Sequence, residues 1–257
     1  MMFHLIKNEW EKIKFPVLIT IAILSIAACI LTNTLYKNYA LHYDLEAWEV
    51  GTELISFLFP LFVVIPICWN VYYERKNHFL LYTMPRVSKR KYLTAKWLIS
   101  AISAFLIFFI PYILSAISAL YVKPPIDTLA DAFVTPFSHI FLTIFTQTPL
   151  LYAFLLSCWK GFVGIFVMSL GFVLSLYIDN IFVILTGPFI YTILENFLLS
   201  IMRLEIYRLV VAFEPTVAPA GSITAGSFLM GLLLISIVIV AVWLYFSKKK
   251  HIDVFKV

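Results

Sequence analysis

Long, largely uncharged stretches alternate with short charged stretches along the chain. Phe15–Leu35, for example, contains no Asp, Glu, Lys or Arg over 21 residues. A helix needs about 20 apolar residues to cross a bilayer. Six such stretches predict six transmembrane helices, at about 15–35, 54–73, 97–122, 148–178, 181–200 and 226–247. The pattern predicts an all-α integral membrane protein with one transmembrane domain over residues 1–257.

The first 14 residues have a different pattern. Phe3, Ile6, Trp10 and Ile13 recur at steps of three and four residues, and the charged residues lie mostly between them. This periodicity is typical of an amphipathic helix that lies in the membrane interface. We therefore expect an interfacial helix over residues 1–14, before the first span.

Thr148–Ser200 can be divided in two ways. One division, around Cys158–Gly161 and Asp179-Asn180, gives seven crossings and places Lys248–Lys250 outside. The other keeps one long helix up to a tight cytoplasmic turn at Asp179-Asn180, followed by a return span. The positive-inside rule favours the second division, with six crossings and both termini cytoplasmic. Three basic residues near the N-terminus, seven in residues 74–96 and four in the tail then place 14 of the 19 Lys and Arg inside.

Two of the connections that are expected outside the cell have distinctive sequences. Residues 136–147 are apolar but too short to span, and residues 201–225 combine short amphipathic turns with Pro215 and Pro219. We expect short extracellular helices in both connections, before the fourth span and between the fifth and sixth.

Residues 74–96 hold most of the positive charge. Seven Lys and Arg lie here against the single acid Glu74, a net charge of +6, whereas the whole chain carries +5. Basic residues that flank apolar spans are retained in the cytoplasm. The same segment contains the large apolar side chains of Phe79, Leu80, Leu81 and Tyr82. A run of such side chains is unfavourable in a loop that only faces water and marks an interaction site. We therefore expect a cytoplasmic segment that binds a soluble partner, with a plain connecting loop as the alternative.

Composition excludes several classes of function. The chain is 62% hydrophobic and 13% charged, whereas soluble domains are about 25% charged. Its pI near 9.0 arises from Lys and Arg at the ends of apolar spans, where they meet lipid headgroups, so membrane lipid and not nucleic acid is the expected partner.

No catalytic motif stands out in the sequence. The five histidines are dispersed without metal-binding spacing, and neither GxSxG nor GxxxxGK[ST] occurs. We expect no catalytic residue, no metal site and no cofactor in this chain.

Two charged residues fall within predicted spans. On antiparallel fourth and fifth helices, Lys160 and Glu195 stand 19 and 16 residues from Asp179, about one helical turn apart in height. Because charges at membrane depth usually pair or face a cavity, we predict an intramembrane ion pair. Separate snorkelling of the two side chains to the outer surface is the alternative.

Aromatic residues make up 17% of the chain. Most are expected to face lipid or to form interfacial belts. Phe57, Phe62, Phe189 and Tyr191, on the second and fifth spans, could instead line a path for an apolar or amphipathic substrate.

These features in order resemble the permease subunit of an ABC-2 type exporter. The similarity rests first on Glu74-Arg75, Met84-Pro85, Ser88–Tyr92 and Lys96 around the cytoplasmic segment. Pro149–Tyr152, Leu174–Asn180 and Gly187–Phe189 are similar to the fourth and fifth spans of permeases from Gram-positive bacteria, and peptide-toxin or bacteriocin exporters are one candidate group. The chain departs from the family at Lys76–His78, where Gly-Thr usually follows the Glu-Arg pair.

The resemblance implies a bacterial cell-membrane protein that works with other chains. Two permeases, identical or related, pair around a central path, and a separate ATPase subunit in two copies binds ATP and Mg. The resemblance places a coupling helix in residues 74–96. It implies that the ATPase contacts are Glu74, Arg75, His78, Phe79, Leu81, Tyr82, Met84 and Arg86.

Three functions therefore compete at the level of sequence. The first is the membrane subunit of an ATP-driven exporter of a hydrophobic or amphipathic substrate. The second is an ion-coupled secondary transporter that uses Lys160 and Glu195. The third is a membrane anchor that recruits a cytosolic partner without transport.

Overall fold

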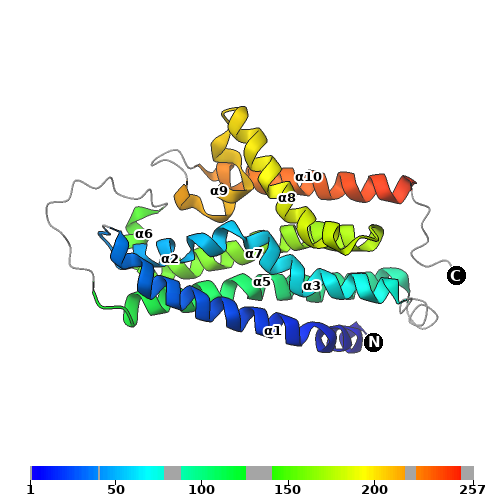
Figure 1. Ribbon diagram of the computed structural model, residues 1–257, viewed down its shortest axis with the longest axis horizontal. Coiled ribbons are helices and arrows are strands. Elements are labelled where there is room, and N and C mark those ends of the chain that lie inside the picture. The colour runs from blue at the N-terminus through cyan, green and yellow to red at the C-terminus, as the bar shows by residue number, and fades with distance from the viewer. Residues whose placement is uncertain (1, 40, 78–87, 126–140, 218–223, 250–257) are drawn as a thin grey trace.

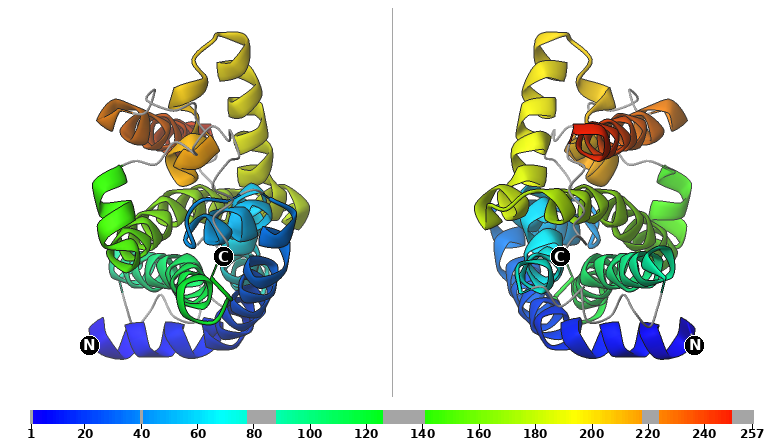
Figure 2. Two further views of the ribbon diagram at one scale, coloured as in Figure 1. Left: turned by 90° about the vertical axis from the view of Figure 1, so that its left-hand side faces the viewer. Right: turned by 90° about the vertical axis from the view of Figure 1, so that its right-hand side faces the viewer.

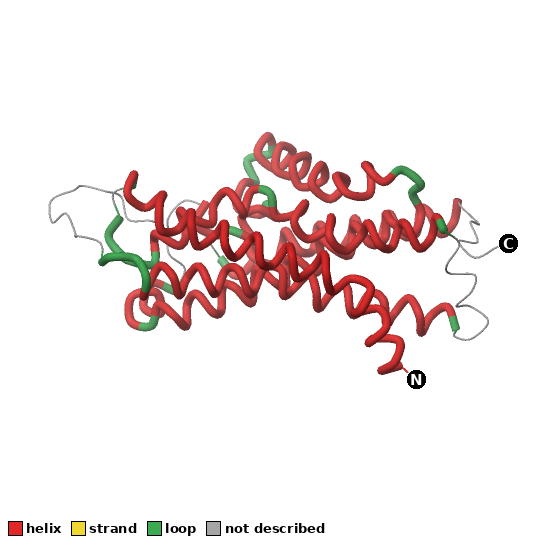
Figure 3. The backbone as a smooth tube through the Cα atoms, turned by 60° about the horizontal axis from the view of Figure 1, so that its bottom comes forward, coloured by secondary structure: helices red, strands yellow, loops and turns green. Residues whose placement is uncertain are grey.

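The computed structural model describes residues 2–39, 41–77, 88–125, 141–217 and 224–249, and all regular structure within these ranges is helical. The long helices lie side by side as an elongated bundle (Figures 1 and 3). They are α1 (Met2–Leu35), α2 (Glu46–Phe57) with α3 (Phe59–Lys76), α5 (Lys89–Tyr121), α7 (Pro149–Tyr177), α8 (Ile181–Ile201) and α10 (Ala225–Lys249). The start of α1, the end of α3, the start of α5 and the end of α10 lie at the same end of the bundle (Figure 1).

The lengths of these helices confirm a multi-span membrane protein. Within the described ranges, five helices are long and apolar enough to cross a membrane, and the bent pair of α2 and α3 gives up to six. The bounds agree with the predicted spans to within a few residues for α7, α8 and α10. The short helix α6 (Leu142–Gln147) precedes α7, where the sequence predicts one.

The predicted interfacial helix and first span form one continuous helix, α1. Its 34 residues include Pro16, whose ring removes one backbone donor and favours a kink. The first part of α1, dark blue in Figure 2, runs at an angle to the rest and lies across the bundle end. The sequence therefore predicts the change of direction but not the continuation of one helix through Pro16.

The second span is broken at Leu58. Helices α2 and α3 meet there at a bend of 52°. Pro60 lies in the first turn of α3, where its missing N–H costs nothing. Of the two prolines expected to kink this span, Pro60 lies beside the bend and Pro66 lies inside α3.

Helix α7 continues through Cys158–Gly161, as the six-crossing division requires. Gly164 allows a close approach to α5, since an added Cβ would lie 2.6 Å from the ring of Phe108. Residues 178–180 then join α7 to α8, and Asn180 caps α8 by accepting the Phe182 N–H at 2.9 Å.

Helices α8 and α10 have the least burial. In the most apolar 18-residue stretch of each of these helices, only 22% is buried. The corresponding values are 56% for α5 and 50% for α7. In the end-on views of Figure 2, α10 and the second half of α8 stand apart from the main bundle. Most of their apolar surface therefore faces outward, as expected for helices in contact with lipid.

The connection between α8 and α10 turns inward. It consists of η2 (Glu205–Tyr207), α9 (Leu209–Phe213) and η3 (Pro215–Val217). The short helical turns expected from the sequence are present. However, Leu209, Phe213 and Glu214 are buried within the protein and do not lie on its surface.

Gly51 gives one test of this packing. An added Cβ at Gly51 would lie 2.4 Å from the Cα of Thr32, so α2 and α1 cannot accommodate a side chain here without a backbone shift that moves them apart. We expect Gly51→Val to destabilise the protein by about 2 kcal/mol or more. Thermal unfolding in detergent measures the effect, with Leu54→Val at an exposed position of the same helix as the matched control. Equal melting temperatures for the two variants would contradict the packing.

Candidate functional site

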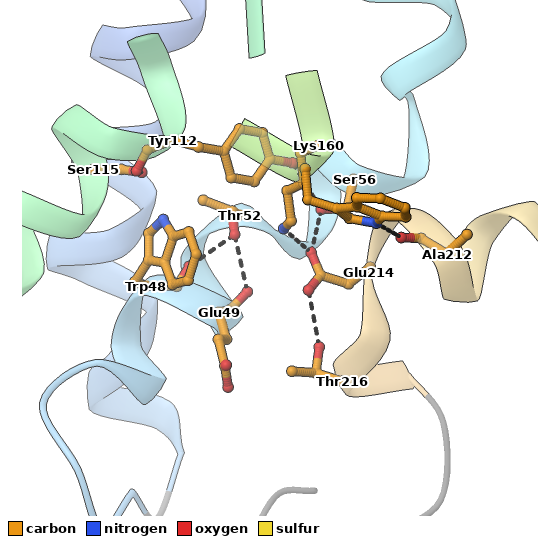
Figure 4. Close-up of polar contacts among 11 residues, drawn as sticks. Trp48, Glu49, Thr52, Ser56, Tyr112, Ser115, Lys160, Ala212, Glu214 and Thr216 are labelled. Carbon is orange, nitrogen blue, oxygen red and sulfur yellow. Dashed lines mark hydrogen bonds and ion pairs between the residues drawn. The ribbon is translucent and has the colours of Figure 1, made fainter. Parts of the chain in front are cut away.

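A charge pair lies inside the bundle. Lys160 of α7 and Glu214, just beyond α9, are 1% and 2% exposed, and their Nζ and Oε2 atoms are 2.5 Å apart (Figure 4). Lys160 is the twelfth of the 29 residues of α7, so the pair lies well away from both ends of this helix. Buried charges of this kind require a partner, and within a membrane they mark functional positions.

Hydroxyl groups from other helices complete the coordination of Glu214. Ser56 Oγ donates to Glu214 Oε2 at 2.6 Å, and the hydroxyls of Ser56 and Tyr112 are 2.8 Å apart. Thr216 Oγ1 donates to Glu214 Oε1 at 3.1 Å. Ser56 lies in the last turn of α2, directly before the break at Leu58, so the bend of the second span lies beside the charge pair.

Aromatic rings enclose the ammonium group. The Nζ atom of Lys160 lies 4.2 Å from the ring centroid of Tyr112, 5.3 Å from that of Trp48 and 5.4 Å from that of Phe213. Cations are attracted to the faces of such rings, and more strongly where water is excluded. The Lys160–Glu214 pair therefore lies in an aromatic enclosure formed by α2, α5, α7 and α9. The buried carboxylate of Glu49 on α2 is close enough to interact electrostatically with Lys160 (Figure 4).

The structure differs from the predicted Lys160–Glu195 pair. The two oxygens of Glu195 accept the Leu209 N–H at 3.2 and 3.3 Å, while Lys160 pairs with Glu214. The prediction compares heights along two adjacent helices, but α8 leans away from α7 over its second half (Figures 1 and 2). The actual partner, Glu214, is the single acid in the apolar run Leu209–Val217, and this pattern is the sequence signal for it.

A second polar cluster joins the basic end of the bundle to α1. Glu74 of α3 accepts hydrogen bonds from Lys96 Nζ and, at 3.1 Å, from the Tyr92 hydroxyl, both on α5. Lys12 Nζ of α1 lies 3.0 Å from Glu74 and 2.5 Å from Glu9, and Lys96 Nζ lies 3.4 Å from Glu9. We call Glu9, Lys12, Glu74, Tyr92 and Lys96 the root cluster, because it joins both ends of residues 77–88 to the N-terminal helix.

Arg75 adds a link to the other half of the bundle. Its guanidinium group lies 3.0 Å from Asp179 Oδ1 and donates to the carbonyl of Ile178. The Tyr72 hydroxyl donates to the carbonyl of Asp179 at 3.1 Å. The end of α3 is thereby tied to the turn between α7 and α8.

These contacts bear on the expected coupling residues. Glu74 and Arg75 engage neighbouring helices, and each side chain is 11% exposed. The other six expected contacts (His78, Phe79, Leu81, Tyr82, Met84 and Arg86) lie outside the described residues.

Two of the four expected path residues meet. The rings of Phe57 and Phe189 pack edge to face with centroids 6.0 Å apart, and Phe57 is 61% exposed. Phe62 and Tyr191 are half-buried and pack against the main core. The substrate path along these residues remains a prediction.

Among the described residues, no group of three His, Cys, Asp or Glu side chains could hold a metal ion. Neither a family model, nor a curated protein, nor a solved structure matches this chain.

Proposed function

We propose that this chain is the membrane permease subunit of an ATP-driven exporter of a hydrophobic or amphipathic substrate. The multi-span helical fold is the framework of the proposal, and the root cluster is the observation that supports it most. A connecting loop does not require four charged side chains packed between three helices, because desolvating charges is costly.

The root cluster would act as a rigid mechanical connection. Lys96 is 4% exposed, and Glu74 holds it between α3 and α5, while Lys12 adds α1. Through Arg75, the turn at Asp179 belongs to the same unit. A push on residues 77–88 would then move α1, α3, α5 and the end of α7 together, as in rigid-body switching.

The proposal includes partners and orientation. A separate ATPase in two copies would carry ATP and Mg, and a second permease, identical or related, would complete the path. The chain would lie in a bacterial cell membrane with both termini and residues 74–96 in the cytoplasm, where the positive-inside rule places most of its Lys and Arg.

The secondary transporter is the second candidate, and the Lys160–Glu214 pair favours it. Transporters of that kind bind their coupling ions near broken helices inside the membrane, and this pair lies beside the break at Leu58. The two candidates differ in their source of energy, which is ATP hydrolysis for the exporter and an ion gradient for the secondary transporter.

Capture of the partner tests the proposal. The tagged chain should retain a nucleotide-hydrolysing subunit from detergent-solubilised membranes of its host. Phe79→Asp and Tyr82→Asp should each weaken the capture roughly thirtyfold, since losing an apolar anchor costs about 2 kcal/mol. Phe255→Asp, in the tail, is the matched control.

Two results would contradict the exporter. One is capture of no such subunit, and the other is equal capture by the Phe79→Asp and Phe255→Asp variants. Substrate flux in vesicles that follows an imposed ion gradient and needs no ATP would support the secondary transporter instead.

A further inference from the structure

Phe213 and Glu214 occupy a receptacle that other helices form. The ring of Phe213 stacks on that of Phe59, with centroids 4.1 Å apart and 13° between the planes. It also lies against the rings of Phe108 and Tyr112, at 5.2 and 6.0 Å. The adjacent carboxylate meets Lys160 and Ser56 (Figure 4). The ring is thus held by groups from α3 and α5, and the neighbouring carboxylate by groups from α7 and α2.

The receptacle has its own requirement for an anion. Lys160 is 1% exposed, and it forms an ion pair with Glu214. If Glu214 moved away, an ammonium group would remain in an apolar enclosure, which is costly. An anion in direct contact with Lys160, in addition to the more distant Glu49, would therefore stabilise any arrangement in which this segment leaves the bundle.

The segment that carries Glu214 is made of short turns. Its three helical pieces have three, five and three residues. Besides the charge pair, its polar anchors include the bond from Trp159 Nε1 to the carbonyl of Ala212, at 2.7 Å, and the bonds from the Leu209 N–H to Glu195. Such a connection can be displaced without unwinding any of the long helices.

We propose that Lys160, Ser56, Tyr112 and Phe59 form a binding site for an amphipathic carboxylate, which Phe213 and Glu214 occupy as an internal substitute. The ligand carries one carboxylate next to an aromatic or aliphatic group. This inference rests on the proposed function and deepens it, because it names the chemical class of the substrate.

The charge of the buried Lys160 favours a carboxylate over a dianion or a neutral group as the ligand. Lys160 makes a direct ion pair with Glu214, and the buried Glu49 adds negative charge nearby, so a neutral amide would leave the ammonium without its direct partner and a dianion would add repulsion. Lys160 and Ser56 both donate to Glu214 Oε2, as they would to one oxygen of a ligand carboxylate. The apolar neighbour of the carboxylate would take the place of Phe213 on Phe59.

Photolabelling of the full chain in lipid nanodiscs tests the site. The probe is N-octanoyl-4-benzoylphenylalanine, and its carboxamide is the matched neutral control. We expect the acid to label the α3 and α7 peptides around Phe59 and Lys160, and the amide to label them at least about tenfold less. Glu214→Gln should increase labelling by the acid about tenfold, because a tethered carboxylate competes at an effective concentration in the millimolar range. Lys160→Met should abolish the preference for the acid.

Thr216→Val gives an independent measurement if Glu214→Gln does not fold. It removes one hydrogen bond to Glu214 and retains the charge balance. We expect labelling by the acid to rise about fivefold, the equivalent of one hydrogen bond. Equal labelling by acid and amide, or an unchanged preference in Lys160→Met, would overturn the proposal.

Competition identifies the source of the carboxylate. Decanoic acid and a hydrophobic decapeptide with a free C-terminus are each added as competitors, together with the C-terminally amidated peptide. Stronger competition by decanoic acid indicates a lipid carboxylate, and competition by the free but not the amidated peptide indicates a peptide terminus. Competition by neither would overturn the proposal. The assay contains no ATPase, so its failure leaves the partner capture through Phe79 and Tyr82 unaffected.

Discussion

Lys160→Met and Glu214→Leu should each destabilise the protein by about 3–5 kcal/mol, whereas the double variant should recover most of the loss. Each single change leaves an uncompensated charge inside the bundle, while the double change removes both charges and keeps the volume filled. Lys160 and Glu214 are 1% and 2% exposed, so water cannot compensate for the missing partner. Unfolding by a denaturing detergent, followed for all three variants, gives the coupling energy of the pair.

Lys14→Met is the matched control for this cycle. Lys14 pairs with Glu11, but their side chains are 30% and 51% exposed. Such partly exposed pairs contribute under about 1 kcal/mol. If Lys160→Met were as mild as Lys14→Met, the charges would be hydrated and the enclosed pair would be refuted.

Glu74→Gln should have the next largest effect, on both stability and coupling. Glu74 joins Lys96, Tyr92 and Lys12, so the change leaves Lys96 buried with Glu9 as its remaining carboxylate. We expect a loss of about 2–4 kcal/mol, because a buried charge-assisted contact is removed. In the complex with the proposed ATPase, ATP hydrolysis should continue while substrate export falls, since the connection between α1, α3 and α5 is loosened.

The measurement compares export per ATP hydrolysed in reconstituted vesicles. Glu11→Gln is the control, because Glu11 lies on the same N-terminal helix but its side chain is 51% exposed. An unchanged ratio in Glu74→Gln would show that the root cluster stabilises the fold without transmitting force.

The sequence predicts the lengths of α7, α8 and α10 well, because each apolar run must match the thickness of the bilayer. It does not predict that α1 and α5 extend beyond their apolar runs, to Met2 and Lys89. It also favours the uninterrupted α7 through a simple argument. The alternative division around Cys158–Gly161 would place Lys248–Lys250 on the outer side, against the positive-inside rule. Both predictions depend on local composition and on the number of crossings.

The partner of Lys160 is not predictable in the same way. Hydropathy gives the length of a helix but neither its tilt nor its rotation, which depend on packing against neighbours. By residue count, Glu195 is at a suitable height along α8. However, α8 leans away from α7, and the Glu195 carboxylate accepts the Leu209 N–H. Glu214 lies 54 residues from Lys160 in a segment whose prolines suggest a surface connection, so only the folded chain brings the two together.

The polar contacts between helices divide the molecule into two parts. Helices α1, α3, α5 and α7 form a frame that the root cluster and Arg75 hold together, while α8 and α10 expose most of their apolar surface. In a bilayer this outer pair exchanges protein contacts for lipid contacts at little cost, because acyl chains are as apolar as its own side chains. The seam between the frame and the outer pair is therefore the least costly place for the protein to open sideways. An amphipathic molecule that reaches Lys160 along this seam would keep its tail in lipid throughout.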